Sequence, residues 1–239
     1  MLGAVVRRYG WICHAYVLMD SHYHLLLETP LPNLSLGIRQ LNGLYGQSFN
    51  RRRSRRGHVF GGRFGSVLVE RDEHFLEAAR YIALNPLRTK RPQRFADWRW
   101  SSYPATAGLA PPASFLTIDD LLGRFGSERR QAQRRYVEFV AAGLGQAAGR
   151  ELIGQIYLGS EEFVRSLAPN EPIPEVPRLQ WQPLRPPLAE LLAGGDGILL
   201  AYRRYGYRLG EIAIHLGVHP ATVSRRLRRL EREADARKP

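Results

Sequence analysis

The chain has 239 residues, enough for one or two domains with buried cores, and its single cysteine, Cys13, excludes a disulfide framework and a cysteine-based zinc finger. Lys+Arg number 35 against 22 Asp+Glu, a net charge of +13, and all but Lys90 and Lys238 are arginine; this favours a polyanionic partner, with nucleic acid ahead of a membrane surface. No apolar run approaches the roughly 18–20 residues that span a bilayer, and no signal peptide opens the chain, so we expect no membrane anchor and a cytoplasmic location.

Hydrophobic periodicity and turn residues predict the elements of the first half. In chain order they are a helix tail at 4–9 closed by Gly10, strands at 11–18 and 22–29 joined by a turn at 19–21, a helix capped by Asn33, a strand at 58–69, and a helix from about 72 to 85 stopped by Pro86. This order predicts an α+β fold, a ferredoxin-like sandwich with its first strand missing.

Composition predicts the divisions of the second half. A stretch rich in Pro, Ala and Gly at 104–118 indicates a boundary, and the segment 169–187 holds seven prolines and reads as an extended linker. Helices are expected at about 118–142, 150–168 and within 188–233. We therefore predict three domains, at 1–108, 109–187 and 188–239, the last of them all-α.

His22 and His24 are separated by one residue at the start of a predicted strand. Because strand side chains alternate, both point to one face, where they can bind one divalent ion. Two histidines on a solvated strand face explain the pair equally well. No cysteine or third histidine is near in sequence, which argues against zinc held by this pair alone.

Tyr81 and Asn85 lie four positions apart on a predicted helix. A tyrosine hydroxyl beside a metal-bound phosphate can form a covalent phosphotyrosine, and an amide one turn further can supply an oxygen ligand. Taken alone, a half-buried core tyrosine and a helix-ending asparagine before proline are the better interpretation.

The motifs MDSHYHLLLETP, LSLGIRQLNGLYGQSFNRR, GHVFGGRF, YIALNPLRTK and DWRWSSYPATAG occur in this order over residues 11–108. Together they resemble the REP-associated tyrosine transposases, relatives of the single-tyrosine HUH transposases of the IS200/IS605 type. The resemblance implies that His22, His24 and Asn85 bind Mg²⁺ or Mn²⁺ and that Tyr81 is the nucleophile. It also implies cleavage of single-stranded hairpin or palindromic DNA to a 5′-phosphotyrosine and a free 3′-OH. Ser21 stands where the family very often has asparagine.

Basic and aromatic residues predict a surface for DNA. The aromatic residues of DWRWSSY, namely Trp98, Trp100 and Tyr103, can stack on unpaired bases or pack onto the sheet, and the sequence favours neither. Phosphate contacts without sequence preference are expected from Arg51, Arg52, Arg53, Arg55, Arg56 and Arg63. A solvated charged loop is the competing interpretation of the arginine run.

The segment from Leu209 to Leu230 has helix-turn-helix spacing, with Gly217 at the turn and apolar stripes on both sides. It resembles a common bacterial DNA-binding module. Residues expected on or near the recognition face are His219, Ala221, Thr222, Ser224, Arg225 and Arg228, of which Thr222, Ser224, Arg225 and Arg228 are the predicted DNA contacts. A helical hairpin that only packs or dimerises is the alternative.

Two functions follow. The first is a metal-dependent DNA strand transferase of the transposase type, with a tail that reads duplex DNA. The second is a sequence-specific DNA-binding regulator whose truncated nuclease domain is inactive. The histidine and tyrosine motifs favour the first, and the missing first strand favours the second.

Overall fold

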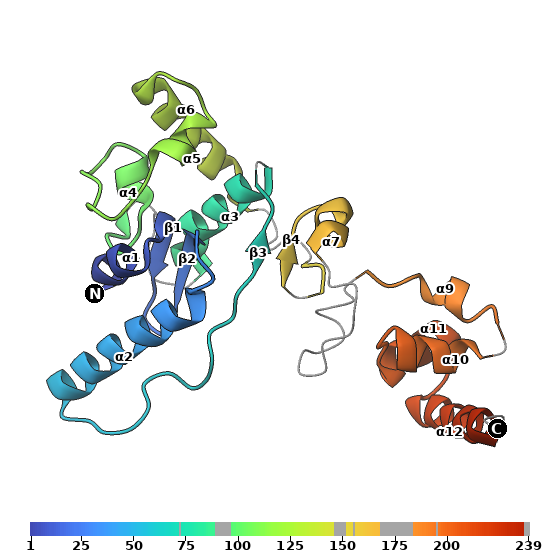
Figure 1. The fold of residues 1–239 in the computed structure, drawn as a ribbon. Coiled ribbons are helices and arrows are strands. Elements are labelled where there is room, and N and C mark those ends of the chain that lie inside the picture. The colour runs from blue at the N-terminus through green and yellow to red at the C-terminus, as the bar shows by residue number, and fades with distance from the viewer. Residues whose placement is uncertain are drawn as a thin grey trace. The chain divides into compact units, whose positions relative to one another are not determined.

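The computed structural model describes residues 1–71, 73–88, 97–145, 152–154, 156–167, 184–194 and 196–236. The chain forms two compact units, Met1–Arg150 and Glu151–Pro239. Helices predominate and the strands are short, so the predicted α+β class is confirmed (Figure 1). In the described part of the chain, no helix is both long and apolar enough to cross a membrane.

The first unit begins with the predicted alternation of helices and strands. Gly10 ends the first helix in the left-handed conformation, with φ +64°, and its N–H donates to the carbonyl of Val6, as at a glycine C-cap. The elements in chain order are α1 (Leu2–Tyr9), β1 (Ile12–Leu18), β2 (Tyr23–Glu28), α2 (Leu34–Arg53), β3 (Leu68–Val69), α3 (Glu73–Leu84), the 3₁₀ turn η1 (Asn85–Arg88), α4 (Tyr103–Thr106), α5 (Asp119–Gly123) and α6 (Arg129–Ala142).

Strands β1 and β2 form the predicted antiparallel hairpin. Its register runs from Leu18 opposite Tyr23 at the turn to Ile12 opposite Glu28 at the far end. A β-bulge at His14 interrupts the ladder, because Cys13 pairs with Leu27 whereas Ala15 pairs with Leu26. A bulge changes the direction of the extra residue's side chain, so His14 does not follow the simple alternation of the strand.

The outer edge of β1 is covered by backbone from later in the chain. The N–H of Leu18 donates to the carbonyl of Trp100 at 2.8 Å, and the N–H of Ser102 donates to the carbonyl of Tyr16 at 2.9 Å. The side-chain hydroxyl of Ser102 also accepts from the N–H of Tyr16 at 3.0 Å. These bonds satisfy ladder groups that would otherwise be unpaired at a sheet edge.

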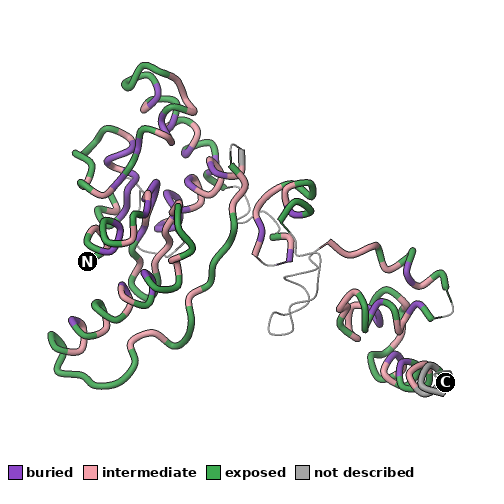
Figure 2. Tube along the Cα trace, in the orientation of Figure 1, coloured by how far each residue is buried: buried purple, intermediate pink, exposed green. Residues whose placement is uncertain are grey.

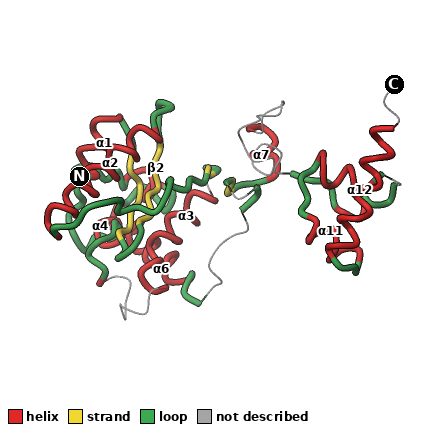
Figure 3. The backbone as a smooth tube through the Cα atoms, turned by 90° about the horizontal axis from the view of Figure 1, so that it is seen from below, coloured by secondary structure: helices red, strands yellow, loops and turns green. Residues whose placement is uncertain are grey.

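The two faces of the hairpin carry different helices. Tyr23 points to α2, where its Oη donates to Oδ1 of Asn42 at 2.7 Å. The next residue, His24, points the other way and meets Tyr81 of α3. Figure 3 shows the strands between α2 and α3. Alternation along β2 therefore separates a face covered by α2 from a face covered by α3.

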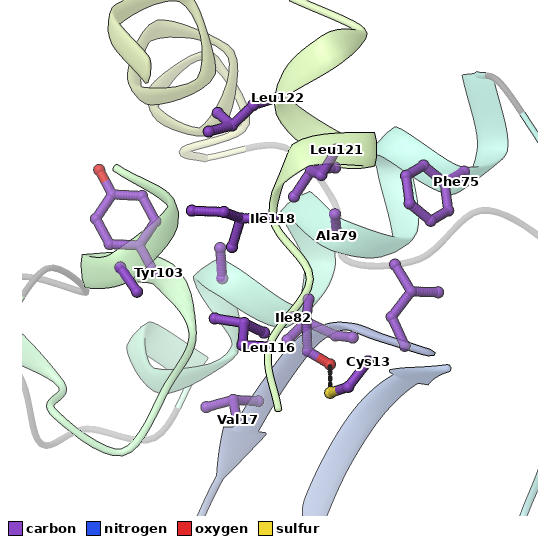
Figure 4. Close-up of a cluster of buried hydrophobic side chains, with 14 of the residues drawn as sticks. Cys13, Val17, Phe75, Ala79, Ile82, Tyr103, Leu116, Ile118, Leu121 and Leu122 are labelled. Atoms are coloured by element: carbon purple, nitrogen blue, oxygen red, sulfur yellow. Dashed lines mark hydrogen bonds between the residues drawn. The ribbon is translucent and has the colours of Figure 1, made fainter. Parts of the chain in front are cut away.

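The core of the first unit lies where β1, α3 and the segment after residue 113 meet (Figure 4). Cys13, Ala79 and Leu121 are almost fully buried there. The N–H of Thr117 donates to the carbonyl of Cys13 at 2.8 Å, which brings this segment onto the hairpin. Figure 2 shows the buried residues concentrated along β1 and the surrounding helices.

The first unit extends beyond residue 108, where the sequence predicted a boundary. Tyr136 and Val140 of α6 are buried in the same core as β1 and α3. Arg80 of α3 lies over the ring of Phe139, 4.5 Å from its centroid. The apolar stripes of α5 and α6 require a partner surface, and α3 provides it. The helix predicted at 118–142 is divided into α5 and α6 by the turn around Gly126, which has a positive φ.

The strand predicted at 58–69 is wrong for most of its length. Only Leu68–Val69 is a strand, and residues 58–67 are irregular. Gly61, Gly62 and Gly65 weaken strand formation because glycine loses the most conformational freedom on ordering. A strand also depends on a paired neighbour, which an alternating pattern alone does not provide.

The elements described in the second unit are helices and one two-residue strand. Leu191, Ala201, Ile212, Ala213 and Val223 form its buried cluster, drawn wholly from the predicted domain at 188–239. Where a helix was predicted at 150–168, the structure has a short strand and a short helix, and most of the predicted linker at 169–187 lies outside the described residues. The elements are β4 (Tyr157–Leu158), α7 (Glu161–Leu167), α9 (Leu188–Leu191), α10 (Gly197–Leu199), the π-helical turn η3 (Leu200–Arg204), α11 (Leu209–Leu216) and α12 (Pro220–Ala236).

Candidate active site

The two histidines of the predicted site lie side by side where β2 begins, His22 immediately before the strand and His24 within it. The ring centroids of His22 and His24 are 5.0 Å apart and the rings are nearly perpendicular. His22 is exposed and His24 is half-buried. Oγ of Ser21 lies 3.2 Å from Nδ1 of His22. With Nδ1 engaged, Nε2 of His22 is the ring nitrogen that can take a metal ion, and the serine orients the ring.

Tyr81 reaches the histidines from α3. Its ring meets that of His24 edge to face, with centroids 5.3 Å apart. The neighbours Ala79, Ile82 and Ala83 are buried in the core, so they fix the orientation of α3 and hold Tyr81 toward β2. Tyr81 itself is half-buried. A strand and a helix separated by the whole of α2 therefore bring an imidazole and a phenol together.

Asn85 follows α3 at the first position of η1, one helical turn beyond Tyr81. Its side chain is 4% exposed, so the amide lies inside the fold. Pro86, which is also buried, ends the α-helix because it lacks an N–H. The role of Asn85 as a third ligand stays a prediction.

The predicted ligands would leave part of the coordination sphere of a divalent ion open. Within the described residues, no three His, Cys, Asp or Glu side chains gather closely enough to hold a metal. The predicted set instead combines the imidazoles of His22 and His24 with the amide of Asn85. Mg²⁺ and Mn²⁺ accept such sparse protein ligation because water and substrate phosphate oxygens complete the shell.

The predicted phosphate-binding arginines are exposed. Arg51, Arg52 and Arg53 form the last turn of α2, and Arg55 and Arg56 follow it. Ser54 ends the helix in the left-handed region, with φ 49°. Arg63 is exposed in the irregular segment beyond. This arrangement is open to a polyanion.

The three aromatic residues after Asp97 differ in their surroundings. Trp98 donates through Nε1 to the carbonyl of Leu18 at 2.9 Å, and Tyr103 is buried against Tyr136. Trp100 is 52% exposed, and only Arg99 lies over its ring, 4.5 Å from the centroid, among the contacts of described residues. Packing therefore explains Trp98 and Tyr103, and Trp100 remains accessible for stacking.

In the second unit, α11 ends at Gly217 in the left-handed conformation and α12 begins at Pro220. Val223 and Leu227 of α12 are buried. Side chains on the other side of α12 face solvent: Arg225 and Arg228 are exposed, and Thr222 and Ser224 are partly exposed. His219, just before α12, is also exposed, and its Nδ1 accepts a hydrogen bond from the N–H of Ala221.

A buried histidine that was not among the predicted site residues, His14, lies in β1. Its Nε2 lies 3.5 Å from Oε2 of Glu28, and its Nδ1 lies 3.9 Å from Oδ2 of Asp120, too far for a hydrogen bond. The ring packs edge to face on Phe75. Burial lowers the pKa of His14 below its ordinary value, and this effect outweighs the opposing influence of the two carboxylates. The signal in the sequence that could have identified His14 is its position within the apolar run of the strand predicted at 11–18.

No family model, curated protein or solved structure matches this chain.

Proposed function

We propose that the protein is a metal-dependent DNA strand transferase of the single-tyrosine HUH type, acting on single-stranded DNA. One observation carries the proposal: the rings of His22, His24 and Tyr81 form a continuous chain of contacts, at 5.0 Å and 5.3 Å between centroids. This is the group of residues that the sequence resemblance singled out.

The site residues divide the chemistry between them. His22, His24 and Asn85 would hold Mg²⁺ or Mn²⁺, which when bound stabilises negative charge on the scissile phosphate. Oη of Tyr81 attacks phosphorus and the P–O3′ bond breaks. The proton lost by Tyr81 ends on the departing 3′ oxygen, leaving a free 3′-OH. The ester between Tyr81 and the 5′-phosphate keeps the free energy of the phosphodiester, so rejoining requires no nucleotide cofactor.

The order of the helices and strands is a second, less specific argument for the same function. The α-β-β-α order of α1, β1, β2 and α2, followed by α3, matches part of the element order of a ferredoxin-like sandwich, although β1 and β2 pair only with each other as named strands among the described residues and β3 does not join them. We assign the first unit to this architecture. The exposed arginines from Arg51 to Arg56 would hold the phosphates of single-stranded DNA without reading sequence.

The second unit supports a second DNA contact. The sharp turn between α11 and α12, the buried Val223 and the exposed Arg225 and Arg228 are compatible with a helix-turn-helix that places α12 in the major groove. Should the nuclease site be inactive, this helix pair would make the protein a sequence-specific DNA-binding regulator.

The test is covalent capture of DNA. The 239-residue chain is incubated with Mg²⁺ or Mn²⁺ and single-stranded hairpins that have randomised flanks and a label at either the 5′ or the 3′ end. A 5′-phosphotyrosine retains the strand on the 3′ side of the cut, so only the 3′ label should migrate with protein on a denaturing gel. EDTA should abolish the adduct.

Tyr81→Phe is the decisive variant, because it removes the hydroxyl and keeps the ring. It should give no adduct while binding hairpins as wild type does. Tyr9→Phe, in α1, is the matched control and should give the wild-type adduct. An adduct in Tyr81→Phe, or none in wild type with any hairpin, would overturn the proposed reaction.

A further inference from the structure

An aromatic cluster lies on the face of β2 opposite the histidines. Tyr45 and Phe49 of α2 stack with centroids 6.0 Å apart and an angle of 29°. The ring of Phe60 lies 5.8 Å from Tyr45 and 6.2 Å from Tyr23, the residue between the two histidines. Tyr45 is 44% exposed, so the cluster is open to solvent at this end.

The exposed end of this cluster opens into a hollow of about 320 Å³, which is lined by Met1 and by Tyr45, Ser48, Phe49, Arg52 and Arg53 of α2. The volume is near the lower end of small-molecule sites, about 300–1,000 Å³, and is suited to a group the size of one nucleotide. Rings and guanidinium groups therefore border the same space.

The charged side chains in the segment of the chain that contains α2 are all positive. Residues 29–69 contain seven arginines and no aspartate or glutamate. Among the described residues, neither Arg52 nor Arg53 forms an ion pair with a carboxylate. Aromatic rings beside unpaired guanidinium groups complement a ligand with a planar base and a phosphate, whereas an acidic peptide would leave the rings without a planar partner.

We propose that this hollow is a base-stacking subsite for single-stranded DNA, in which an unpaired base packs on Tyr45 and Phe49 and its phosphates meet Arg52 and Arg53. The inference rests on the proposed function for its choice of nucleic acid. It goes beyond that function in placing a base contact on the face of the hairpin opposite His22 and His24.

The test separates stacking from phosphate binding. Anisotropy titrations in EDTA compare labelled oligodeoxythymidine with an abasic strand of equal length, using the full chain. Because stacking contributes about 1–3 kcal/mol per base, wild type should bind oligodeoxythymidine roughly 5- to 150-fold more tightly. Tyr45→Ala should remove most of this preference and leave the affinity for the abasic strand unchanged.

Four further variants sharpen the result. Tyr45→Phe keeps the ring and should keep the preference, and Tyr202→Ala, at an exposed tyrosine of the second unit, should have no effect. Replacing Arg52 and Arg53 by Gln should weaken both strands equally and reduce the salt slope by about 1.4, since each phosphate contact to a single strand contributes about 0.7. The same substitutions at Arg130 and Arg134 of α6 provide the charge-matched control.

Equal affinity of wild type for the two strands would overturn the subsite, as would equal losses on both strands in Tyr45→Ala. Tighter binding of oligouridine than of oligodeoxythymidine would indicate an RNA site and would also overturn it. These titrations contain no metal and form no adduct. Failure of the Tyr81 reaction therefore leaves their outcome unaffected, and failure of stacking leaves the Tyr81 reaction intact.

Discussion

The ring of His24 meets the ring of Tyr81 edge to face, with 5.3 Å between centroids, although α2 and a long irregular segment separate the two residues in the chain. The contact depends on alternation along β2, which turns His24 toward α3, and on the buried side of α3, which turns Tyr81 toward β2. It places a potential nucleophile beside a potential metal ligand.

His24→Ala is expected to abolish metal-dependent cleavage. The substitution removes one of two imidazole donors, and even loss of an outer-shell partner commonly costs about 10- to 100-fold in metal affinity or activity. Adduct formation is measured against Mn²⁺ concentration. His58→Ala, at an exposed histidine of the irregular segment, should behave as wild type. Undiminished adduct in His24→Ala would remove this residue from the ligand set.

Replacing Arg225 and Arg228 of α12 by Gln should weaken binding to duplex DNA and spare binding to single-stranded hairpins. Both side chains are exposed on the helix that we assign to the major groove. If both contact phosphates, the salt slope for duplex binding should fall by about 1.8, from about 0.9 per contact. The double variant at Arg130 and Arg134 again serves as the control. Equal losses on duplex and hairpin would show that one surface binds both.

Gly37→Ala should destabilise the first unit by about 1–3 kcal/mol or more, as overpacking does. A Cβ at this position would lie 2.1 Å from Cζ2 of Trp11. The indole cannot easily move, because it is 5% exposed and its Nε1 donates to Oδ1 of Asn33 at 2.8 Å. Urea unfolding measures the change.

Gly43→Ala on the same helix is the matched control for Gly37→Ala. A Cβ there has no heavy atom within 4 Å, so the substitution should stabilise α2 by about 0.5–1 kcal/mol through helix propensity. Equal effects of the two substitutions would contradict the packing of Trp11 against α2.

Local patterns predicted much of the first unit. The Gly10 cap, the hairpin and the end of α3 before Pro86 each depend on neighbouring residues, so the sequence contains the necessary information. A strand over 58–69 would have needed a partner strand from another part of the chain. The packing of α6 depends on its long-range contact with α3. Neither relationship is visible in periodicity.

In the candidate site too, local relationships were predicted from the sequence and long-range ones were not. Alternation along β2 was sufficient to place His22 and His24 together. The approach of Tyr81 to His24 is long-range, and only the family resemblance indicated it. His14 was missed because the β-bulge, which depends on pairing with β2, determines where its side chain points.

The unfolding free energy should depend on pH through His14. Burial lowers the pKa of His14 in the folded protein, so the unfolded chain binds this proton more readily. The stability associated with neutral His14 is therefore fully present above the unfolded pKa, about 6.5. It is lost as pH falls through that value, and the loss ends once pH passes below the lower folded pKa.

Urea unfolding of wild type and His14→Leu between about pH 7.5 and 5, on either side of the ordinary histidine pKa, tests this expectation. The variant removes the titrating ring and leaves Glu28, Asp120 and Arg71, the charged groups around it, in place. Wild type should lose stability on acidification more steeply than His14→Leu. Parallel pH profiles for wild type and His14→Leu would mean that His14 titrates alike in the folded and unfolded chains, contrary to its burial against Phe75.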